Sequence, residues 1–424
     1  MKVTLINTSD AGGGAPVACM RLLKALTLKK VDAGLLVKEK KTSDSRVTSV
    51  NKGLFSRIKT GFNLLYERVP FILFKAKNKT LRFAFSTANA GTDISDRREI
   101  LGADILHLHW INFGYLSIND LRKLFQTGKP VVWTLHDMWA FTGGCHYSGD
   151  CDHFEHHCGD CWMLRHPNEH DLSFTGWKRK SEMYKEAKNM VFVTCSHWLA
   201  GVARTSSLLK NFRIETIPNP IDTAIFLPKE KANARKKWNI SPTAKIILFG
   251  AANIIDRRKG ISYLIEALSE LKKTEHEQPI EIVIFGKNKS FDASTLPFKV
   301  HELNMITAQD DLVSLYSLAD VFVTPAIEDN LPNTVMESLA CGTPVVAFNT
   351  GGIPDMVDHQ KNGYLAEFKS SADLAIGLHY VLNAENTAEL SANARKKVLD
   401  NFTNEIVAAK YLELYHSILK NERV

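Results

Sequence analysis

Compact runs of apolar residues recur along the first half of the chain, separated by stretches in which apolar positions have helical spacing. The runs are almost entirely apolar rather than alternating, which is typical of strands buried on both faces of a parallel sheet. The stretches between them, such as 117–126, have the spacing of helices that cross over such a sheet. The pattern predicts strands at 2–7, 33–38, 103–110, 130–137, 190–196 and 212–218.

The alternation breaks at residues 217–237, where Pro, Asn and then charged residues dominate. It restarts beyond this point and predicts strands at 244–253, 280–286, 299–303, 320–326 and 343–348. We therefore predict an α/β fold of two Rossmann-like, doubly wound parallel-sheet domains, residues 1–218 and 219–401, with a C-terminal helix at about 402–424 that packs back on the first. Because ligands of such sheets bind beyond the carboxyl ends of the strands, the domains are expected to face each other across a cleft.

Composition and charge narrow the class of protein. No run of about 18 apolar residues is present, so no transmembrane helix is expected. The first residues, MKVTLINTSDAGGG, predict a buried strand rather than a signal peptide, which favours the cytoplasm. The net charge is +7, and residues 38–82 hold 12 Lys and Arg against 3 Asp and Glu. Such an excess of positive charge gives information about what the protein binds, and not about its fold.

Segment 54–85 interleaves Leu, Phe, Ile and Tyr with Lys and Arg. One interpretation is ordinary helix packing with a solvated basic face. The other is peripheral contact with an anionic membrane. Nucleic acid is not expected as a partner, because no nucleic-acid-binding motif accompanies the segment.

Three glycines follow the first predicted strand, in the stretch NTSDAGGGAP (7–16). Gly13 and Gly14 stand at the start of the next predicted helix, where free N–H groups suit an anion. The spacing matches neither the G-x-G-x-x-G fingerprint nor a P-loop, which argues against a nicotinamide site or a P-loop ATPase. A plain tight turn is one interpretation, and we favour the other, a loop that closes over a phosphorylated ligand.

A second predicted helix start, in TPAIEDNLPNTVMESLACGTPVV (324–346), has acidic residues on both sides of it. Pro332 suits the first helical position, and the amides of 333–335 would point at a diphosphate. Glu337 could accept hydrogen bonds from vicinal ribose hydroxyls. Glu328 or Asp329 would face a sugar, and the spacing from Glu337 favours Asp329. For either acid alone, a solvated side chain that complements the helix dipole is the alternative.

This stretch resembles the retaining glycosyltransferases of family 4, which have the two-domain GT-B fold. The family carries Glu-x7-Glu followed by a Gly-Thr-Pro-Val-Val run, and this chain has Asp329-x7-Glu337 followed by the same run at 342–346. The resemblance implies that Glu337 binds the nucleotide ribose and that the first acid acts near the donor sugar. The donor-binding residues expected in addition are Glu328, Asn330, Leu331, Asn333, Thr334, Gly13, Gly14 and Gly286, the last at a strand end near the base.

The resemblance also implies cations at the donor diphosphate. Lys259 matches the family Lys, while the family Arg is absent at Ala252-Asn253, so that Arg257 or Arg258 would substitute. Cations are disfavoured at a helix start unless they have an anionic partner, which favours a functional role here. Neutralising a leaving diphosphate is the physical need.

Residues at two first-domain strand ends complete the predicted site. His136 matches the family His that faces the donor sugar, with a capping or core histidine as the alternative. His109, Trp110 and Asp137 are expected on the acceptor side. The predicted catalytic set is His136, Lys259, Asp329 and Glu337. Because no first-domain carboxylate, Asp137 included, must act as a nucleophile, the resemblance favours front-face transfer, in which the leaving phosphate oxygen takes the acceptor proton.

Four of the seven cysteines lie within residues 143–162, spaced C-x5-C-x6-C-x2-C among four histidines. In a cytoplasmic protein this pattern predicts first a structural zinc site, with reduced cysteines or a disulfide-stapled loop as alternatives. The loop directly follows His136 and Asp137 and is expected to shape the acceptor pocket. Similar Thr-Gly-Gly-Cys-His loops occur in a subgroup of the family from polysaccharide gene clusters. The predicted ligands are Cys145, Cys151, Cys158 and Cys161.

These features predict a glycosyltransferase (EC 2.4) that moves a sugar from a nucleotide-diphospho-sugar to a glycan or lipid-linked acceptor, with retention, in cell-surface polysaccharide or lipopolysaccharide biosynthesis. No cofactor is expected to be required for catalysis. The expected location is the cytoplasm, with peripheral contact at the inner face of the membrane through 54–85. The alternatives are a nucleotide-sugar epimerase or hydrolase on the same fold and a catalytically inactive sugar-nucleotide-binding protein.

Overall fold

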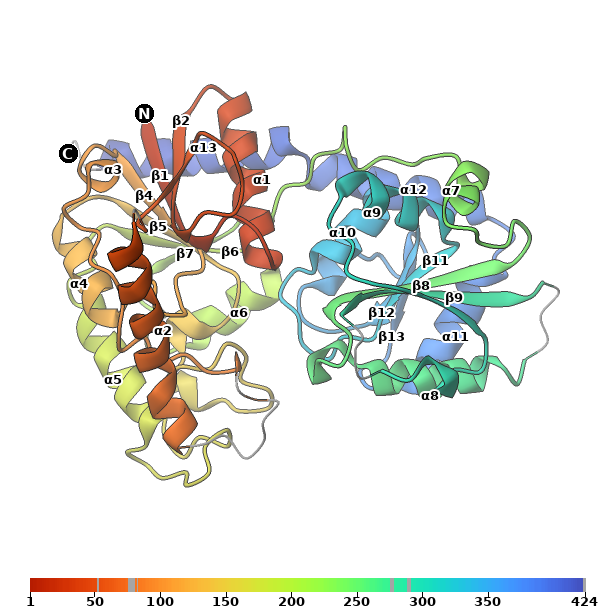
Figure 1. Cartoon of the computed structure of the whole chain (residues 1–424), viewed down its shortest axis with the longest axis horizontal. Coiled ribbons are helices and arrows are strands. Elements are labelled where there is room, and N and C mark those ends of the chain that lie inside the picture. Colours follow the sequence, from red (N-terminus) through yellow and green to blue (C-terminus); the bar gives the residue numbers. More distant parts are fainter. Residues whose placement is uncertain (52, 75–80, 82, 275–277, 288–290, 422–424) are drawn as a thin grey trace. The chain divides into compact units, whose positions relative to one another are not determined.

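The computed structural model describes residues 1–51, 53–74, 81, 83–274, 278–287 and 291–421. The chain divides into two compact units (Figure 1). The first unit consists of Met1–Pro220 together with Glu405–Val424, and the second of Ile221–Asn404. None of the described helices combines the length and the hydropathy that are needed to cross a bilayer.

The first unit is built on a sheet of parallel strands in the order β3-β2-β1-β4-β5-β6-β7. Its central strands are buried along nearly their whole length because helices cover both faces. The strand order reverses between β1 and β4, which is where doubly wound sheets bind their ligands. The strands are β1 (Lys2–Ser9), β2 (Asp32–Glu39), β3 (Val47–Ser49), β4 (Ile105–Leu108), β5 (Val131–Leu135), β6 (Met190–Thr194) and β7 (Arg213–Thr216).

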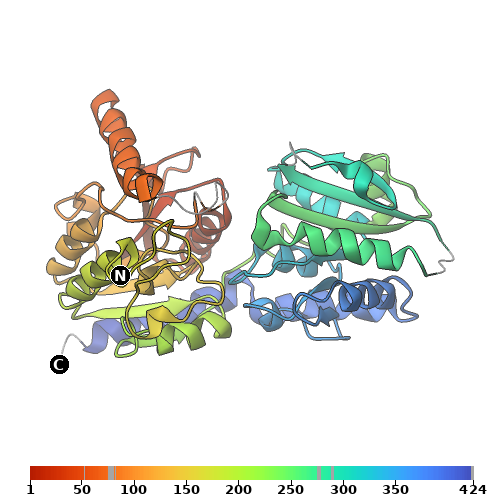
Figure 2. The same ribbon diagram turned by 90° about the horizontal axis from the view of Figure 1, so that it is seen from below.

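The helices of the first unit begin where the sequence provides capping residues. Ser117 and Asp120 form a capping box at α4, Asp171 accepts from two amides at α5, and Ser196 accepts from Leu199 N at α6. The helices are α1 (Gly14–Leu28), α2 (Leu54–Phe74), α3 (Arg98–Leu101), α4 (Ile118–Gln126), α5 (Leu172–Tyr184), α6 (His197–Thr205) and α13 (Asn404–Asn421). Figure 2 shows that α2 stands out from the rest of this unit.

The last helix of the chain, α13, packs against the first sheet. Tyr411, Leu414 and Tyr415 share an apolar cluster with Val3 and Leu5 of β1. The hydroxyl of Tyr415 lies 2.7 Å from Nδ1 of the buried His107. These contacts make α13 part of the core of the first unit.

The second unit is also a doubly wound parallel sheet, in the order β10-β9-β8-β11-β12-β13. The predicted fold class is therefore confirmed. The strands are β8 (Lys245–Asn253), β9 (Ile280–Lys287), β10 (Lys299–Leu303), β11 (Val321–Thr324), β12 (Val345–Phe348) and β13 (Gly363–Ala366). The helices are α7 (Lys231–Lys237), α8 (Ile261–Leu271), α9 (Gln309–Leu318), α10 (Asn333–Ala340), α11 (Ser371–Leu382) and α12 (Thr387–Asn401).

Candidate active site

The start of α10 lies at the carboxyl end of β11, next to the point where the strand order of the second sheet reverses. Pro332 occupies the N-cap, with φ −64°, one residue earlier than the predicted helical position. The proline side chain itself offers no hydrogen-bond acceptor to the amides of the first turn. Because the amides of a helix start carry partial positive charge, this end of α10 suits an anion such as a diphosphate.

Lys259 and Asp329 form an ion pair beside this helix start. Lys259 ends a short 3-10 turn after β8, and its Nζ lies 2.6 Å from Oδ2 of Asp329 in the loop after β11. Both side chains are largely buried, with exposed fractions of 26% for Lys259 and 15% for Asp329. Lys259 is the cation predicted to neutralise the diphosphate, and Asp329 is the acid predicted to face the sugar. The ion pair holds these two side chains next to each other.

Gly260 allows this close approach of two loops. It has φ +69°, in the left-handed region, and a Cβ at this position would lie 1.8 Å from the carbonyl oxygen of Pro325. The amide of Ile327 also donates to the carbonyl of Arg258 at 2.8 Å. The loop that carries Asp329 is therefore fixed to the turn that carries Lys259.

The two arginines of this turn differ in their contacts. Arg258 Nη2 lies 2.7 Å from Oδ2 of Asp256, which also caps the turn by accepting from Arg258 N. Arg257 opens the same turn. Because Arg258 is committed to Asp256, Arg257 is the better candidate for the missing family arginine.

Glu337 is buried on α10 and is oriented by a tyrosine that the sequence pattern did not single out. The hydroxyl of Tyr316, on α9, donates to Oε2 of Glu337 at 2.9 Å, and the tyrosine is fully buried. Phe285 and Phe322 pack edge-on against the tyrosine ring. The contact therefore holds the Glu337 carboxylate in one orientation.

On the prediction that Glu337 binds the donor ribose, Tyr316→Phe is expected to raise the KM for the donor about five-fold with little change in kcat, because one hydrogen bond of about 1 kcal/mol that orients Glu337 is lost. Initial rates over a donor titration measure this. The phenylalanine keeps the ring contacts, so the unfolding midpoint should stay close to that of the wild type. A lower kcat at unchanged KM would contradict the positioning role.

The remaining donor-side residues of the prediction lie in three places. Asn330 and Leu331 are buried in the loop before α10, with Glu328 half-buried near them, and Asn333 and Thr334 open the helix. Gly286 closes in on β8, where a Cβ would lie 1.9 Å from the carbonyl of Ala251. In the first unit, Gly13 is the N-cap of α1 and Gly14 its first residue.

The carboxyl ends of β4 and β5 bring together two histidines predicted for the site. Nδ1 of His109 lies 3.0 Å from Nε2 of His136, and the rings stack at 5.3 Å. Burial lowers the pKa of His136 to about 4 and the pKa of His109 well below its usual range. Both rings are therefore neutral near pH 7, when each can donate or accept a hydrogen bond without adding charge.

Asp137 accepts hydrogen bonds on both of its carboxylate oxygens. Its Oδ2 accepts from Trp110 Nε1 at 2.8 Å and from His146 Nδ1 at 2.7 Å, and its Oδ1 accepts from Trp139 N at 2.9 Å. Burial raises the pKa of Asp137, but the His146 ring and the other donors outweigh it and leave the pKa below its usual range. Such a carboxylate holds its neighbours in place rather than attacking a substrate.

His146 continues this network to Ser86, since its Nε2 lies 2.9 Å from Ser86 Oγ. The order Asp137, His146, Ser86 resembles a hydrolytic triad, but Ser86 is 1% exposed and cannot meet a substrate. The role is therefore to orient Trp110 and His146. The sequence spacing gave no indication of this hydrogen-bond network, because Ser86 and His146 are 60 residues apart.

Comparison with known proteins assigns the family. The model of Glycosyltransferase Family 4 matches residues 12–225, and that of Glycosyl transferases group 1 matches residues 230–397. The chain belongs to glycosyltransferase family 4.

Two relatives in sequence and one solved structure are similar to this family 4 chain. It is 25% identical over 243 residues to N-acetyl-alpha-D-glucosaminyl L-malate synthase of Bacillus anthracis, covering 55% of this chain and 61% of that protein. It is 26% identical over 323 residues to D-inositol 3-phosphate glycosyltransferase of Pseudarthrobacter chlorophenolicus, covering 74% and 70%. Anabaena HepE in complex with UDP-glucose has 14% identity and a TM-score of 0.62, over 98% of this chain and all of that one. The likeness confirms the GT-B fold.

The cysteine loop of this family 4 chain does not form the predicted zinc site. Within the described ranges, no three His, Cys, Asp or Glu side chains are gathered to hold a metal ion, and every cysteine there is free. The disulfide-stapled alternative is not formed either. Cys145 packs instead beside Cys161 and Phe85 in an apolar cluster, and burial raises the pKa of Cys158 and Cys161 to about 12. The thiols are therefore protonated near neutral pH.

A buried lysine secures the start of this loop. Lys180, on α5, is fully buried, donates to the carbonyls of Trp139 and Thr142, and lies 3.6 Å from the centre of the Trp139 ring. Burial lowers the pKa of this lysine to about 7. The Lys180 side chain thus holds the segment after Asp137 through the carbonyls of Trp139 and Thr142.

Replacing Lys180 with methionine is expected to change how stability depends on pH. The unfolded chain keeps the lysine proton up to its ordinary pKa of 10.5, while the folded chain releases it near pH 7. Between these values the unfolded state binds more protons, so the wild type gains up to about 1.4 kcal/mol in free energy of unfolding per pH unit, and the variant lacks this gain. Urea unfolding of both proteins at pH 7, 8 and 9 measures it. A wild-type-minus-variant difference that stays constant with pH would contradict it.

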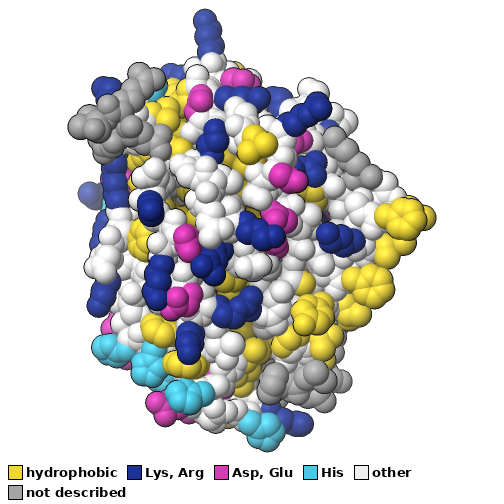
Figure 3. Space-filling view, turned by 90° about the vertical axis from the view of Figure 1, so that its left-hand side faces the viewer, with side chains coloured by type: hydrophobic (Ala, Val, Ile, Leu, Met, Phe, Trp, Pro, Cys, Tyr) yellow, Lys and Arg dark blue, Asp and Glu magenta, His cyan; other side chains and the backbone are white. Residues whose placement is uncertain are grey.

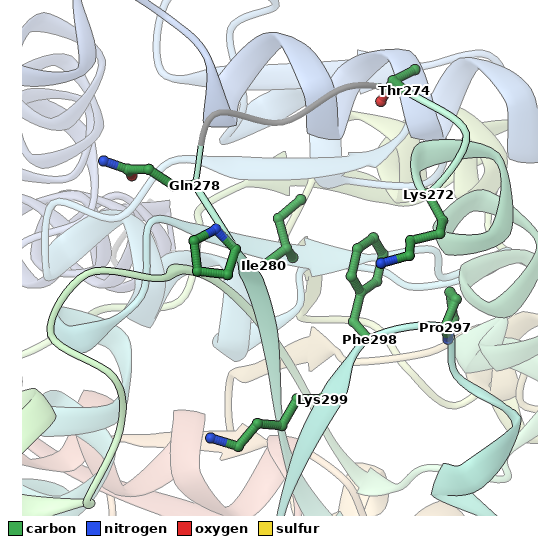
Figure 4. Close-up of a pocket in the computed structure, with 8 residues that line it drawn as sticks. Lys272, Thr274, Gln278, Ile280, Pro297, Phe298 and Lys299 are labelled. Carbon is green, nitrogen blue, oxygen red and sulfur yellow. The ribbon is translucent and has the colours of Figure 1, made fainter.

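A cavity of about 360 Å³ in the second unit lies away from these loops. Figure 4 shows Ile280, Phe298 and Lys299 among its lining residues. Because β9 begins at Ile280 and β10 at Lys299, the cavity lies at the amino ends of the strands. Family 4 chemistry is expected at the opposite, carboxyl ends, so this cavity is not the donor site.

Proposed function

We propose that the chain transfers a sugar from a nucleotide-diphospho-sugar to an acceptor hydroxyl, with retention at the anomeric carbon. The observation that carries the proposal is the Lys259–Asp329 pair, in the loops that meet before the start of α10, in a chain of family 4. A neighbour of the same fold was solved with UDP-glucose, which supports a nucleotide-sugar donor.

In this proposal the second unit binds the donor. Lys259, Arg257 and the amides of 333–335 neutralise the diphosphate, while Glu337 accepts hydrogen bonds from the ribose. Asp329 faces the donor sugar and is kept there by Lys259 at 2.6 Å. Near them lie the other proposed donor contacts, Glu328, Asn330, Leu331, Asn333, Thr334, Arg258 and Gly286.

The first unit contributes neutral polar groups and an aromatic side chain. His136 offers a hydrogen bond to a hydroxyl of the donor sugar, and Gly13 and Gly14 provide amides for a phosphorylated ligand. His109 and Trp110 stand on the acceptor side, with Trp110 oriented by Asp137.

The reaction is proposed to proceed by attack on the face from which the diphosphate leaves. The acceptor hydroxyl bonds to the anomeric carbon, the bond to the phosphate oxygen breaks, and that oxygen takes the hydroxyl proton. Lys259 lowers the barrier by balancing charge on the leaving group. Asp137, whose carboxylate accepts three hydrogen bonds from its neighbours, is a poor candidate for a covalent nucleophile.

The experiment is a donor panel with measurement of released nucleotide diphosphate and of the anomeric configuration of the product. Release that depends on an acceptor, with the donor configuration kept, supports the proposal. An altered nucleotide sugar formed without acceptor indicates an epimerase, and release without acceptor a hydrolase. Tight donor binding without any release indicates an inactive binding protein.

The proposed setting is cell-surface polysaccharide or lipopolysaccharide biosynthesis, in the cytoplasm at the inner face of the membrane. The names of the curated relatives mention malate and inositol 3-phosphate, so they do not share one acceptor. The names of the relatives therefore do not indicate the acceptor of this chain, and surface features of the chain are the remaining guide to it.

A further inference from the structure

Helix α2 turns its apolar side toward solvent. Of the nineteen large hydrophobic side chains that are exposed among the described residues, eight lie on this helix. Phe55 is 89% exposed, Phe62 66% and Tyr66 65%. Figure 3 shows apolar side chains gathered along one edge of the first unit. A surface helix of a globular protein normally has the opposite arrangement.

The inner side of α2 carries polar residues that are anchored by specific hydrogen bonds, followed near its end by the buried Phe71. Thr60 Oγ1 donates to Asn51 Oδ1 at 2.6 Å, and Asn63 Nδ2 donates to the carbonyl of Gly91 at 2.7 Å. The carboxylate of Glu67, which is 1% exposed, accepts from the amide of Gly114. These contacts determine which side of the helix faces the protein, and so leave the apolar side outward.

The outward side is also cationic. Arg57 and Lys59 are exposed on its first turns. Glu67 is the one acidic residue of segment 54–74, and it is buried on the inner side. An apolar surface with basic and no acidic side chains complements an anionic lipid surface. A second copy of the same surface would bring like charges together.

The same helix supports the loop 110–114, which carries Trp110, proposed above to lie on the acceptor side. A Cβ on Gly114 would lie 2.6 Å from the backbone nitrogen of Leu64, so this loop packs directly on the α2 backbone. Arg68 of α2 lies 5.4 Å from the centre of the Phe113 ring, and Phe113 packs edge-on against Trp110 at 4.7 Å. Trp110 is thus linked to α2 through a single intervening ring.

We propose that α2 lies in the surface of an anionic lipid bilayer, with Phe55, Phe62 and Tyr66 at the boundary between headgroups and acyl chains. Trp110 is then held by a helix that rests on lipid, and the acceptor is a molecule anchored in that bilayer. The identity of the acceptor rests on the proposed function, while the docking of α2 does not.

The test uses the full chain and flotation with vesicles of phosphatidylcholine, with and without about 30% phosphatidylglycerol. The wild type should bind the anionic vesicles, and Phe55→Ser/Phe62→Ser/Tyr66→Ser and Arg57→Gln/Lys59→Gln should each weaken binding at least about ten-fold. The matched control Ile376→Ser/Leu399→Ser removes two exposed apolar side chains of the second unit and should bind like the wild type.

Unchanged flotation of the triple variant, or no flotation of the wild type, overturns the docking proposal. A wild-type dimer that dissociates in the triple variant without any vesicle binding would assign the surface to a second copy instead, and overturns it as well. Thermal unfolding of each variant shows that the fold is kept.

Activity separates this proposal from the proposed function. With a water-soluble acceptor the triple variant should release nucleotide diphosphate at the wild-type rate, whereas with a lipid-anchored acceptor in vesicles it should lose at least about ten-fold. Equal rates of the two proteins on vesicles overturn the bilayer-anchored acceptor. Absence of release by any protein with any acceptor, with flotation intact, overturns the proposed function and leaves docking standing.

Discussion

Replacing Lys259 with methionine is expected to lower kcat by about 10²- to 10³-fold, which is the usual loss when one group that stabilises developing charge is removed. The Nζ of Lys259 lies 2.6 Å from Oδ2 of Asp329, in the loop that leads into α10. Without it, the proposed leaving diphosphate loses a cation and the largely buried Asp329 loses its partner. Release of nucleotide diphosphate at saturating donor concentration measures the effect.

The matched control is Lys231→Met. Lys231 also forms an ion pair, 2.8 Å from Asp320, but Asp320 precedes β11 at the opposite end of the sheet and also binds Arg235. The control should keep the wild-type kcat. If both variants lost activity equally, the loss would reflect a general weakening of the second unit rather than chemistry at the diphosphate.

Gly260→Ala is expected to lower kcat/KM by about 10²-fold, because displacements near 1 Å in a catalytic arrangement have effects of this size. The free energy of unfolding should also fall by about 2–4 kcal/mol. The residue has φ +69°, and the new methyl group would collide with the carbonyl of Pro325. Relief of the collision moves the loop of Asp329 away from Lys259. Donor kinetics and urea unfolding measure the two effects.

Gly128→Ala separates backbone strain from collision. Gly128 has φ +72°, nearly the same as Gly260, but nothing lies within 4 Å of the position of its Cβ. The alanine should lower the free energy of unfolding by about 1 kcal/mol and leave kcat/KM unchanged. If Gly260→Ala behaved in the same way, the close contact with Pro325 would have no role in holding the site.

The fold was predictable because its signal is local and repeated. Runs such as 190–196 begin with consecutive apolar residues (190–193), since both faces of a strand in a doubly wound sheet are covered. The strand ends then follow directly, which is how His136 and Lys259 could be assigned to carboxyl-end loops. The spacing of Asp329 and Glu337 also carries information, because one short helix start connects them.

Partners that are distant in the sequence were not predictable. Tyr316 lies in an ordinary amphipathic helix and gives no sign that its hydroxyl reaches Glu337. Ser86 meets His146 only through the folded loop. The cysteine spacing was misleading for a related reason. Residue spacing does not fix the directions of side chains, and Cys145 and Cys161 point into an apolar cluster with Phe85.

Because α13 packs on the first sheet, the second unit is an insertion between two segments of the first unit. A fragment that stops at Pro220 would lack Tyr411 and Tyr415, whose hydroxyls lie 2.8 Å from Thr134 and 2.7 Å from His107. The two ends of this inserted unit lie next to each other, since Ile221 and Thr403 form a parallel β-bridge. The first unit therefore needs residues from both sides of the second, so a division of the chain into separate units would remove Ile221–Asn404 as one insert and join Pro220 to Glu405.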